Sequence, residues 1–225
     1  MLSVIIPTLN AEKTINRTLD SVQALSLPML EVLVVDGGSN DDTSHRATEL
    51  GAKVLHGEPG RGRQLAHGAS VAKGPWLLFL HADTILPPDW EIDLSRFITA
   101  ERNLGLAGYF RLGFDAKGRG ARRVAALANW RADVFGLPYG DQGLLIHRDL
   151  YETVGGYRAE LNLMEDVDLV RRIGPMRLKR LNRTVITSAV RYQTGGWWAR
   201  PARNLLCLGL HLLGAPQSWI ERLYR

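Results

Sequence analysis

The chain has 225 residues, of which 45% are hydrophobic and 23% are charged, so it is long and apolar enough to bury one full globular core. Its single cysteine, Cys207, excludes an internal disulfide, and no Cys/His cluster has the spacing of a zinc site. The net charge of +5 is unevenly distributed, since residues 1–110 hold 9 Lys/Arg against 13 Asp/Glu whereas residues 111–225 hold 19 against 10.

Three apolar runs in the N-terminal part of the chain each end in a polar loop. Residues 3–6 lead into Pro7 and Thr8, residues 31–35 lead into Asp36, and residues 76–80 lead towards Asp83. Consecutive large apolar side chains are typical of strands that are buried on both faces of a parallel sheet. In such a sheet, ligands bind beyond the carboxyl ends of the strands. Asp36 and Asp83 are therefore expected to face a binding crevice.

Helical segments separate these strands. We expect Asn10 to be the N-cap of the first helix, Asp41 or Asp42 to cap the second, and Gly51 to end it. A short strand at 53–55, a flexible basic loop at 57–63 and a small-residue helix at 64–72 complete this part. The order β-α-β-α-β-α-β predicts a half-Rossmann arrangement with right-handed crossovers.

The alternation is looser after Asp83. The expected elements are a helix at 89–100, a strand at 107–114, a basic segment at 117–123 leading into a helix through 135, a loop at 140–143, a strand at 144–147 and a helix starting near 164. Neither an internal repeat nor a low-complexity linker interrupts the chain. We therefore predict one domain over residues 1–196, divided into portions 1–85 and 86–196, followed by a C-terminal helical extension over 197–225.

Two common kinds of nucleotide site do not match this sequence. A dinucleotide-binding fold has G-x-G-x-x-G directly after its first strand, where this chain has Pro7 to Asn10 without a glycine. The glycines at 60 and 62 follow the third strand and lack the final glycine of the motif. A phosphate-binding P-loop, G-x-x-x-x-G-K-[ST], is missing as well. Hydride transfer and P-loop hydrolysis are thus both disfavoured.

A nucleotide bound by carboxylates and basic groups remains. Asp36 can accept hydrogen bonds from a base or a ribose, and Asp83 can hold Mg²⁺ or Mn²⁺ against a diphosphate, because these ions are commonly bound by one or two carboxylates plus substrate phosphates. A second carboxylate is needed to deprotonate an incoming hydroxyl. Glu165 and Asp166, at the start of a helix, are the downstream candidates.

Several polar residues of the sequence also have a purely structural interpretation. Asp36 can simply begin an Asp-Gly turn, and Asp141 can form an Asp turn. His81 can be a packing histidine, and the acids at 165 and 166 can serve only to favour a helix start. The sequence leaves these alternatives open.

Four segments, residues 3–10, 34–43, 80–84 and 164–166, carry a combination of motifs in a characteristic order and spacing. Taken together, they closely resemble the inverting family-two glycosyltransferases of the GT-A fold. The resemblance extends over roughly residues 2–175, and the chain looks most like the short, stand-alone bacterial members with Arg-x-x-Gln in the third loop and a Gly-Asp-Gln-Gly loop. The resemblance implies an α/β, GT-A-like fold with a mostly parallel central sheet.

The resemblance also implies roles for individual residues. Asp83 would be the metal-binding final acid of the D-x-D motif and Asp166 the general base, with Glu165 as its supporting partner. The nucleotide-binding residues would be Pro7, Thr8, Asn10, Asp36, Gly38, Arg61, Arg63, Gln64, His81 and Ala82. The acceptor-binding residues would be Asp141, Gln142, Trp197 and Trp198. One departure is that His81 replaces the first acid of D-x-D, so a negative charge is lost and strict metal dependence is in doubt.

The C-terminal part is basic and contains a short apolar run. From Arg171 onward, 11 Lys/Arg face a single acid, Glu221, and Trp197-Trp198 precede an apolar run at 205–213 that is too short to span a bilayer. These features suit interfacial membrane binding near a lipid-linked acceptor. Docking onto the protein's own core or onto a second copy, as a homodimer, is the other interpretation. A nucleic-acid partner is disfavoured because the tryptophans lie beside an apolar run rather than in a repeated basic-aromatic pattern.

The function that the sequence predicts is transfer of a sugar from a nucleotide-diphosphate sugar to a hydroxyl acceptor, with inversion and a divalent metal. The alternative is a degenerate nucleotide-binding regulatory or membrane-tethering module, for which His81 is the sequence support. Met1 opens directly into the first strand, so we expect no signal peptide and a cytoplasmic protein that can be peripheral on the membrane.

Overall fold

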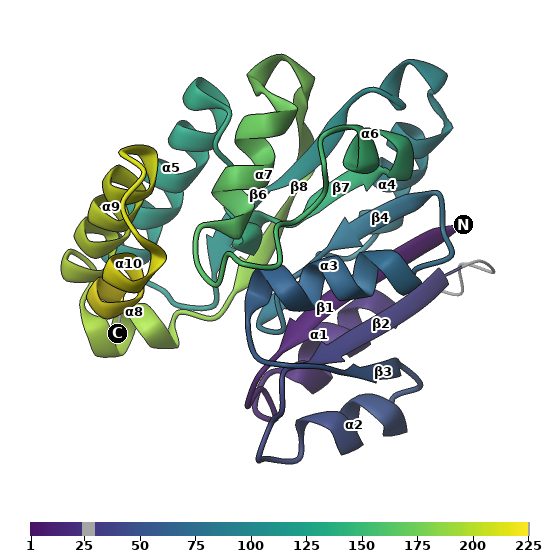
Figure 1. Cartoon of the computed structure of the whole chain (residues 1–225), viewed down its shortest axis with the longest axis horizontal. Helices are drawn as coiled ribbons and strands as arrows, with labels where there is room; N and C mark the ends of the chain where they lie inside the picture. The colour runs from purple at the N-terminus through teal and green to yellow at the C-terminus, as the bar shows by residue number, and fades with distance from the viewer. Residues whose placement is uncertain (24–29, 225) are drawn as a thin grey trace.

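A mixed sheet forms the spine of the computed structural model, which describes residues 1–23 and 30–224, and helices cover both faces of the sheet (Figure 1). The strands are β1 (Leu2–Thr8), β2 (Leu30–Asp36), β3 (Lys53–His56), β4 (Trp76–Phe79), β5 (Thr84–Ile85), β6 (Ala107–Phe114), β7 (Leu144–His147) and β8 (Leu178–Thr187). Their order across the sheet is β3-β2-β1-β4-β7-β6-β8-β5. Of these described strands, only β7 and β5 run antiparallel to their neighbours. The predicted mostly parallel α/β sheet is confirmed.

The helices lie in two layers and a lateral group. They are α1 (Ile15–Gln23), α2 (Thr43–Glu49), α3 (Arg61–Val71), α4 (Trp90–Thr99), α5 (Arg119–Phe135), α6 (Arg148–Thr153), α7 (Glu165–Ile173), α8 (Val190–Gly195), α9 (Ala199–Leu212) and α10 (Gln217–Tyr224), with short 3₁₀ turns η1 (Glu101–Asn103), η2 (Gly140–Gln142) and η3 (Pro175–Arg177). α1 and α4 contribute to the apolar core on one face, and α3, α6 and α7 to the core on the other. α5, α9 and α10 stand together at one side of the molecule (Figure 1).

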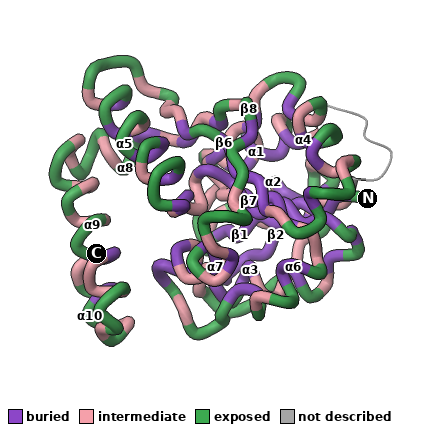
Figure 2. Tube along the Cα trace, turned by 90° about the horizontal axis from the view of Figure 1, so that it is seen from above, coloured by how far each residue is buried: buried purple, intermediate pink, exposed green. Residues whose placement is uncertain are grey.

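The central strands are buried on both faces, as their apolar runs predict. In β4, Leu78 packs with the core on one face while Leu77 and Phe79 pack with the core on the other. Figure 2 shows the buried residues concentrated along these strands, with exposed residues on the helices and loops around them. Burial of this kind contributes about 2 kcal/mol per large side chain, so the central strands hold the sheet edge and its loops in place.

Several predicted boundaries are wrong. The glycine- and arginine-rich segment 57–63 is not wholly a flexible loop, because α3 begins at Arg61. Asn10 is not the cap of α1, which begins at Ile15; it adopts a left-handed backbone conformation with a φ of 51°. Strands β5 and β8 and helix α6 were not predicted, since they are short or carry many polar side chains.

Gly62 allows the first turn of α3 to pack closely against a neighbouring loop. Its N–H donates to the carbonyl of Leu161 at 3.2 Å. A Cβ at this position would lie 2.4 Å from the carbonyl oxygens of both Arg158 and Leu161. The first turn of α3 therefore lies directly against the loop that precedes α7.

We expect Gly62→Ala to destabilise the protein by about 3 kcal/mol, because two backbone oxygens must move to admit one methyl group. The matched control is Gly209→Ala in α9, where a Cβ would meet nothing within 4 Å and the helix propensity of alanine should add about 0.5–1 kcal/mol. Urea unfolding of both variants measures the difference. Equal stabilities would show that the loop can shift without cost.

The C-terminal helices pack through a small apolar cluster. Leu163, Met164 and Val167 contact Cys207, Leu208 and Ile220 of α9 and α10. Within the described residues, no helix is both long and apolar enough to cross a membrane. The division of the chain at 196/197, the membrane contact and the homodimer stay predictions.

Candidate active site

The carboxyl ends of β1, β2 and β4 lie at one edge of the sheet. Thr8 at the end of β1 pairs in register with Asp36 at the end of β2, and Ile5 pairs with Phe79 of β4. The loops that follow these strands therefore converge. They form two groups of polar residues, one beyond β1 and β2 and the other beyond β4.

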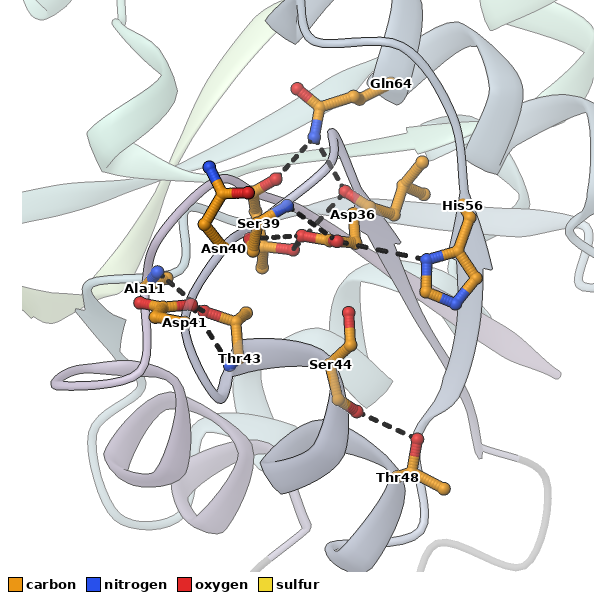
Figure 3. Close-up of polar contacts among 12 residues, drawn as sticks. Ala11, Asp36, Ser39, Asn40, Asp41, Thr43, Ser44, Thr48, His56 and Gln64 are labelled. Atoms are coloured by element: carbon orange, nitrogen blue, oxygen red, sulfur yellow. Dashed lines mark hydrogen bonds and ion pairs between the residues drawn. The ribbon is translucent and has the colours of Figure 1, made fainter.

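The first group centres on Asp36, which is 2% exposed (Figure 3). Its carboxylate accepts hydrogen bonds from the Ser39 N–H at 3.0 Å, from the Ser39 hydroxyl, and from the Thr8 hydroxyl at 3.2 Å. Burial acts to raise the pKa of Asp36, but these hydrogen bonds outweigh it and the pKa lies below its ordinary value. Asp36 is therefore a fixed, ionised acceptor at the sheet edge.

Other residues of the predicted nucleotide site shape the same loop. Gln64 of α3 donates its amide to the carbonyls of Thr8 at 2.8 Å and Val35 at 2.7 Å, tying the ends of β1 and β2 together (Figure 3). The Asn10 side chain accepts the N–H of Asn40 at 2.9 Å. Gln64 thus binds the backbone of β1 and β2. The hydrogen bond between Asn10 and Asn40 connects the loops that follow these two strands.

Four other residues of the predicted nucleotide site make no side-chain hydrogen bond to Asp36. Pro7 is buried within β1, and Gly38 has a φ of 88° with open space where a side chain would be. Ala82 is half-buried and its carbonyl accepts the Thr18 hydroxyl at 2.9 Å. Arg63 is exposed on α3 and forms an ion pair with Glu58.

The second group surrounds a cavity of about 340 Å³ between the sheet edge and the lateral helices. Its polar lining includes the residues predicted for metal binding and catalysis, which are Asp83, Glu165 and Asp166. It also includes Arg61 and His81 of the predicted nucleotide site and Asp141 of the predicted acceptor site. These residues come from α3, the loop after β4, η2 and α7. The fold therefore brings together acids that are more than 80 residues apart in the sequence.

Asp83 and Asp166 are both half-buried and both line this cavity. One carboxylate oxygen of Asp83 lies 3.5 Å from the Thr187 hydroxyl of β8. The Asp166 carboxylate accepts the N–H of Gly140 at 2.6 Å and that of Val167 at 2.7 Å. These backbone contacts fix the orientation of Asp166 at the start of α7.

Glu165 has a different environment from its neighbour. It is 1% exposed, and its carboxylate lies 3.5 Å from the guanidinium Nε of Arg61. Burial raises the pKa of Glu165 to about 7, although the positive charge of Arg61 acts against the rise. Glu165 is thus a buried partner of Arg61 rather than a group facing solvent.

His81 and Asp141 are also perturbed by their surroundings. Burial, together with the charges of Arg61 and Arg191, lowers the pKa of His81 to about 3, so its imidazole is neutral at physiological pH. Burial raises the pKa of Asp141 to about 6, against the opposing charge of Arg131. One Asp141 oxygen is buried and has no hydrogen-bond partner among the described residues.

Asp141→Asn should make the protein more stable at pH 8. The folded-state pKa of Asp141 is about 6, above its ordinary value of 3.8, so its stabilising contribution is complete below about pH 3.8 and is lost as the pH rises through 6. A neutral asparagine removes that loss, with a gain on the order of 1–3 kcal/mol at pH 8 and little change at pH 4. Urea unfolding at both pH values checks this, and an equal effect at pH 4 and pH 8 would contradict the assigned shift.

The residues present fit a divalent cation that is shared with a substrate. No group of three or more His, Cys, Asp or Glu within the described chain could hold a metal by itself. The Asp83 carboxylate faces the cavity with only the long contact to Thr187, and Mg²⁺ or Mn²⁺ can combine one such carboxylate with phosphate oxygens. The neutral imidazole of His81 offers a nitrogen ligand but, unlike a carboxylate, no negative charge.

The tryptophans predicted for the acceptor site do not line the cavity. Trp197 stacks on Tyr192, with ring centroids 5.5 Å apart, and also contacts Phe114. Trp198 is 72% exposed, and the Arg123 guanidinium lies 6.0 Å from its ring. Gln142 is fully buried and donates to a β6 carbonyl at 3.1 Å.

Sequence reasoning missed the basic and aromatic residues that line the cavity near the acids. Arg131 and Tyr139 line it, with the Arg131 guanidinium 3.2 Å from the Tyr139 ring centroid. Arg191, on α8, lines it as well. The basic residues of α5 and α8 were visible in the sequence only as net charge, because nothing in their spacing connects them with the acids at 83 and 166.

A family model described as Glycosyl transferase family 2 matches residues 3–162, which include the Asp36 group and Asp83. The chain belongs to glycosyl transferase family 2. The resemblance seen in the sequence is thereby confirmed. Glucosyl-3-phosphoglycerate synthase from Mycobacterium tuberculosis (strain ATCC 25618 / H37Rv) is 35% identical over 96 residues, which are 38% of this chain and 30% of that protein. The chain therefore matches only about a third of the length of its curated relatives.

Solved structures of glycosyltransferases have the same fold as this family 2 chain. Glucosyl-3-phosphoglycerate synthase from Mycobacterium tuberculosis, in complex with Mn²⁺, UDP and glucosyl-3-phosphoglycerate, superposes with a TM-score of 0.61 at 22% identity, covering 96% of this chain and 81% of that one. A mannosyltransferase from Pyrobaculum calidifontis, in complex with GDP-Man and Mn²⁺, gives a TM-score of 0.63 at 18% identity, covering 90% and 59%. The family 2 chain thus has a GT-A-like fold.

Proposed function

We propose that this chain is an inverting glycosyltransferase that uses a nucleotide-diphosphate sugar and a hydroxyl acceptor. The observation that carries the proposal is the convergence of Asp83 and Asp166 on one cavity, at the same edge of the sheet as the ionised Asp36. The related proteins that bind UDP or GDP-Man with Mn²⁺ support the same kind of donor. Asp36, at the ends of β1 and β2, is the acceptor of hydrogen bonds from the base or ribose.

The chemistry is a single in-line displacement. Asp166 takes the proton of the acceptor hydroxyl, whose oxygen forms a bond to the anomeric carbon on the face opposite the diphosphate. The bond from the anomeric carbon to the diphosphate oxygen breaks, and its electron pair leaves with the nucleoside diphosphate. Attack and departure on opposite faces invert the configuration, and positioning of both reactants in one cavity lowers the entropic part of the barrier.

Asp83 is the residue that would hold a divalent cation, with His81 as its neutral neighbour. Bound there, Mg²⁺ or Mn²⁺ would neutralise negative charge on the departing diphosphate. Arg191 lines the same cavity, and its positive charge acts on His81. Donor binding should therefore depend on Asp83 more than on any other single acid of the cavity.

Asp83→Asn should lower the affinity for UDP in the presence of Mn²⁺ by at least about tenfold, as measured by isothermal titration calorimetry. The matched control is Asp89→Asn, which removes the same charge from an exposed residue beyond the cavity. Wild type and both variants are also titrated without metal. Equal UDP affinity in wild type and Asp83→Asn with Mn²⁺ would rule out the metal role.

The alternative of a regulatory module without turnover, which the neutral His81 favours, is tested by adding an assay of nucleoside diphosphate release to these titrations. Such a module would bind UDP or GDP with Mn²⁺ but would release no nucleoside diphosphate from a nucleotide sugar in the presence of acceptors. Tight donor binding with no release across a broad acceptor panel would replace the enzyme proposal with this one.

A further inference from the structure

The acidic and the apolar side chains of the cavity come mainly from different elements. Asp83, Asp141 and Asp166 lie at its inner end by the sheet edge, whereas α5 and α9 contribute mainly apolar side chains, together with Arg131, Arg200 and Asn204. Val124, Leu127 and Trp130 contribute from α5, and Leu205 and Leu208 from α9. Figure 1 shows both helices on the same side of the molecule, away from the nucleotide half of the sheet. A molecule filling this space would therefore meet carboxylates at one end and hydrocarbon at the other.

Polar atoms at the inner end are buried without partners. Among the described residues, the Tyr139 hydroxyl, one Asp141 oxygen and the Arg131 Nη2 have no hydrogen-bond partner. Buried polar groups are normally hydrogen-bonded, and leaving one unpaired costs about 1–3 kcal/mol. Hydroxyl groups of a bound ligand can both donate to Asp141 and accept from Arg131. The inner end thus suits a hydroxylated head.

The charges of the cavity disfavour an anionic acceptor. Arg61 is paired with Glu165, and Arg200 lies with its guanidinium 4.4 Å from the Tyr224 ring centroid. Arg131 donates its Nε to the Leu137 carbonyl at 2.9 Å and has its guanidinium 3.2 Å from the Tyr139 ring centroid, and the charge of Arg191 acts on His81, two residues before Asp83. With the carboxylates of Asp83 and Asp166 nearby, an uncharged head is the better match.

We propose that the acceptor is an amphiphile, with an uncharged hydroxylated head beside Asp166 and Asp141 and a hydrocarbon tail between α5 and α9. This inference rests on the proposed function, because it assigns the acceptor of that reaction. The cavity volume of about 340 Å³ lies within the range of small-molecule sites and admits the head with the first part of a tail. Leu127 and Leu205 are 56% and 60% exposed, so the rim lets a longer tail extend outwards.

The probes are methyl, hexyl and octyl β-D-glucoside, used below their micellar concentrations. Binding to the full chain with UDP and Mn²⁺ is followed by calorimetry, and 3-phosphoglycerate is titrated as the anionic comparison. We expect affinity to rise with tail length, approaching about fourfold per buried methylene, and 3-phosphoglycerate to bind more weakly than octyl glucoside. A flat series, or tighter binding of 3-phosphoglycerate, would overturn the inference.

Two neighbouring leucines of α9 provide a matched pair of variants. Leu205 lines the cavity and Leu206 does not, although their exposed fractions are 60% and 59%. Leu205→Gln should weaken octyl glucoside binding about tenfold and leave methyl glucoside unchanged, whereas Leu206→Gln should change neither. Equal losses in both variants would show general adsorption to the surface and overturn the assignment of the cavity.

The donor titration separates this inference from the proposed function. If UDP binds with Mn²⁺ but the alkyl series is flat, only the amphiphilic acceptor is wrong. If the alkyl series behaves as expected but UDP does not bind, the cavity ligand is no acceptor and both proposals fail for that reason. Transfer of a radiolabelled sugar to octyl glucoside, detected by thin-layer chromatography, would support both together.

Discussion

Asp166→Asn should lower turnover by roughly two to four orders of magnitude, the usual contribution of a positioned general base. Asparagine has the same shape and can still accept the N–H of Gly140, but it cannot take a proton from the acceptor. Affinity for UDP with Mn²⁺ should stay within about twofold of wild type, because the donor is held by Asp36, Asp83 and their neighbours. Steady-state kinetics and calorimetry on the same preparation measure the two effects.

Glu165→Gln is the comparison that tests this assignment. Glu165 is 1% exposed and faces Arg61, so its substitution should act mainly on stability and should lower turnover less than Asp166→Asn does. If Glu165→Gln abolishes turnover while Asp166→Asn retains it, Asp166 is not the base. If Asp141→Asn has the largest kinetic effect of the three, the proton acceptor lies on η2 instead of α7.

The strands of the nucleotide half could be predicted from the sequence because each is an apolar run that ends at a polar residue. β6 and β7 were predicted at their observed bounds for the same reason. β8 was missed because Arg180, Arg183 and other polar residues interrupt its apolar pattern. Its pairing with β6 depends on residues some 70 positions away, and no local pattern reports such a partner.

The candidate site was predictable where a residue's role follows from its place at a strand end, and not where it follows from packing between distant elements. Asp36 and Asp83 belong to the first kind, since Asp36 ends the buried strand β2 and Asp83 lies in the loop that follows the buried strand β4. Gln64 belongs to the second, because its amide joins two strand ends instead of facing a ligand. The apolar wall of α5 and α9 also belongs to the second, since amphipathic helices of this kind usually cover a core.

The Arg61–Glu165 pair is a further contact that only the fold reveals. It connects the first turn of α3 with the first turn of α7, and so joins the nucleotide half to the helix that holds Asp166. Glu165 raises the pKa of Arg61, which keeps the guanidinium charged. Because Glu165 is almost fully buried, the pair should matter for stability more than an ion pair on the surface does.

Arg61→Met should destabilise the protein by about 3 kcal/mol at pH 8, because it leaves the Glu165 carboxylate buried without its cation. The folded-state pKa of Glu165 is about 7, above its ordinary value of 4.5, so its stabilising contribution is complete below about pH 4.5 and is lost as the pH rises through 7. Without Arg61 this pKa rises further, and the loss at pH 8 grows. Urea unfolding at pH 5 should show a much smaller effect, since Glu165 is then protonated in both proteins.

The double variant Arg61→Met/Glu165→Gln decides whether the effect belongs to the pair. A neutral glutamine removes the unpaired charge, so the double variant should recover most of the stability lost in Arg61→Met at pH 8 and should lose the added pH dependence. Stability that stays low in the double variant would assign the role of Arg61 to its contact with Tyr224, which also raises the pKa of Arg61. Recovery of stability without recovery of turnover is the expected result, because the guanidinium that lines the cavity beside Asp166 is still missing.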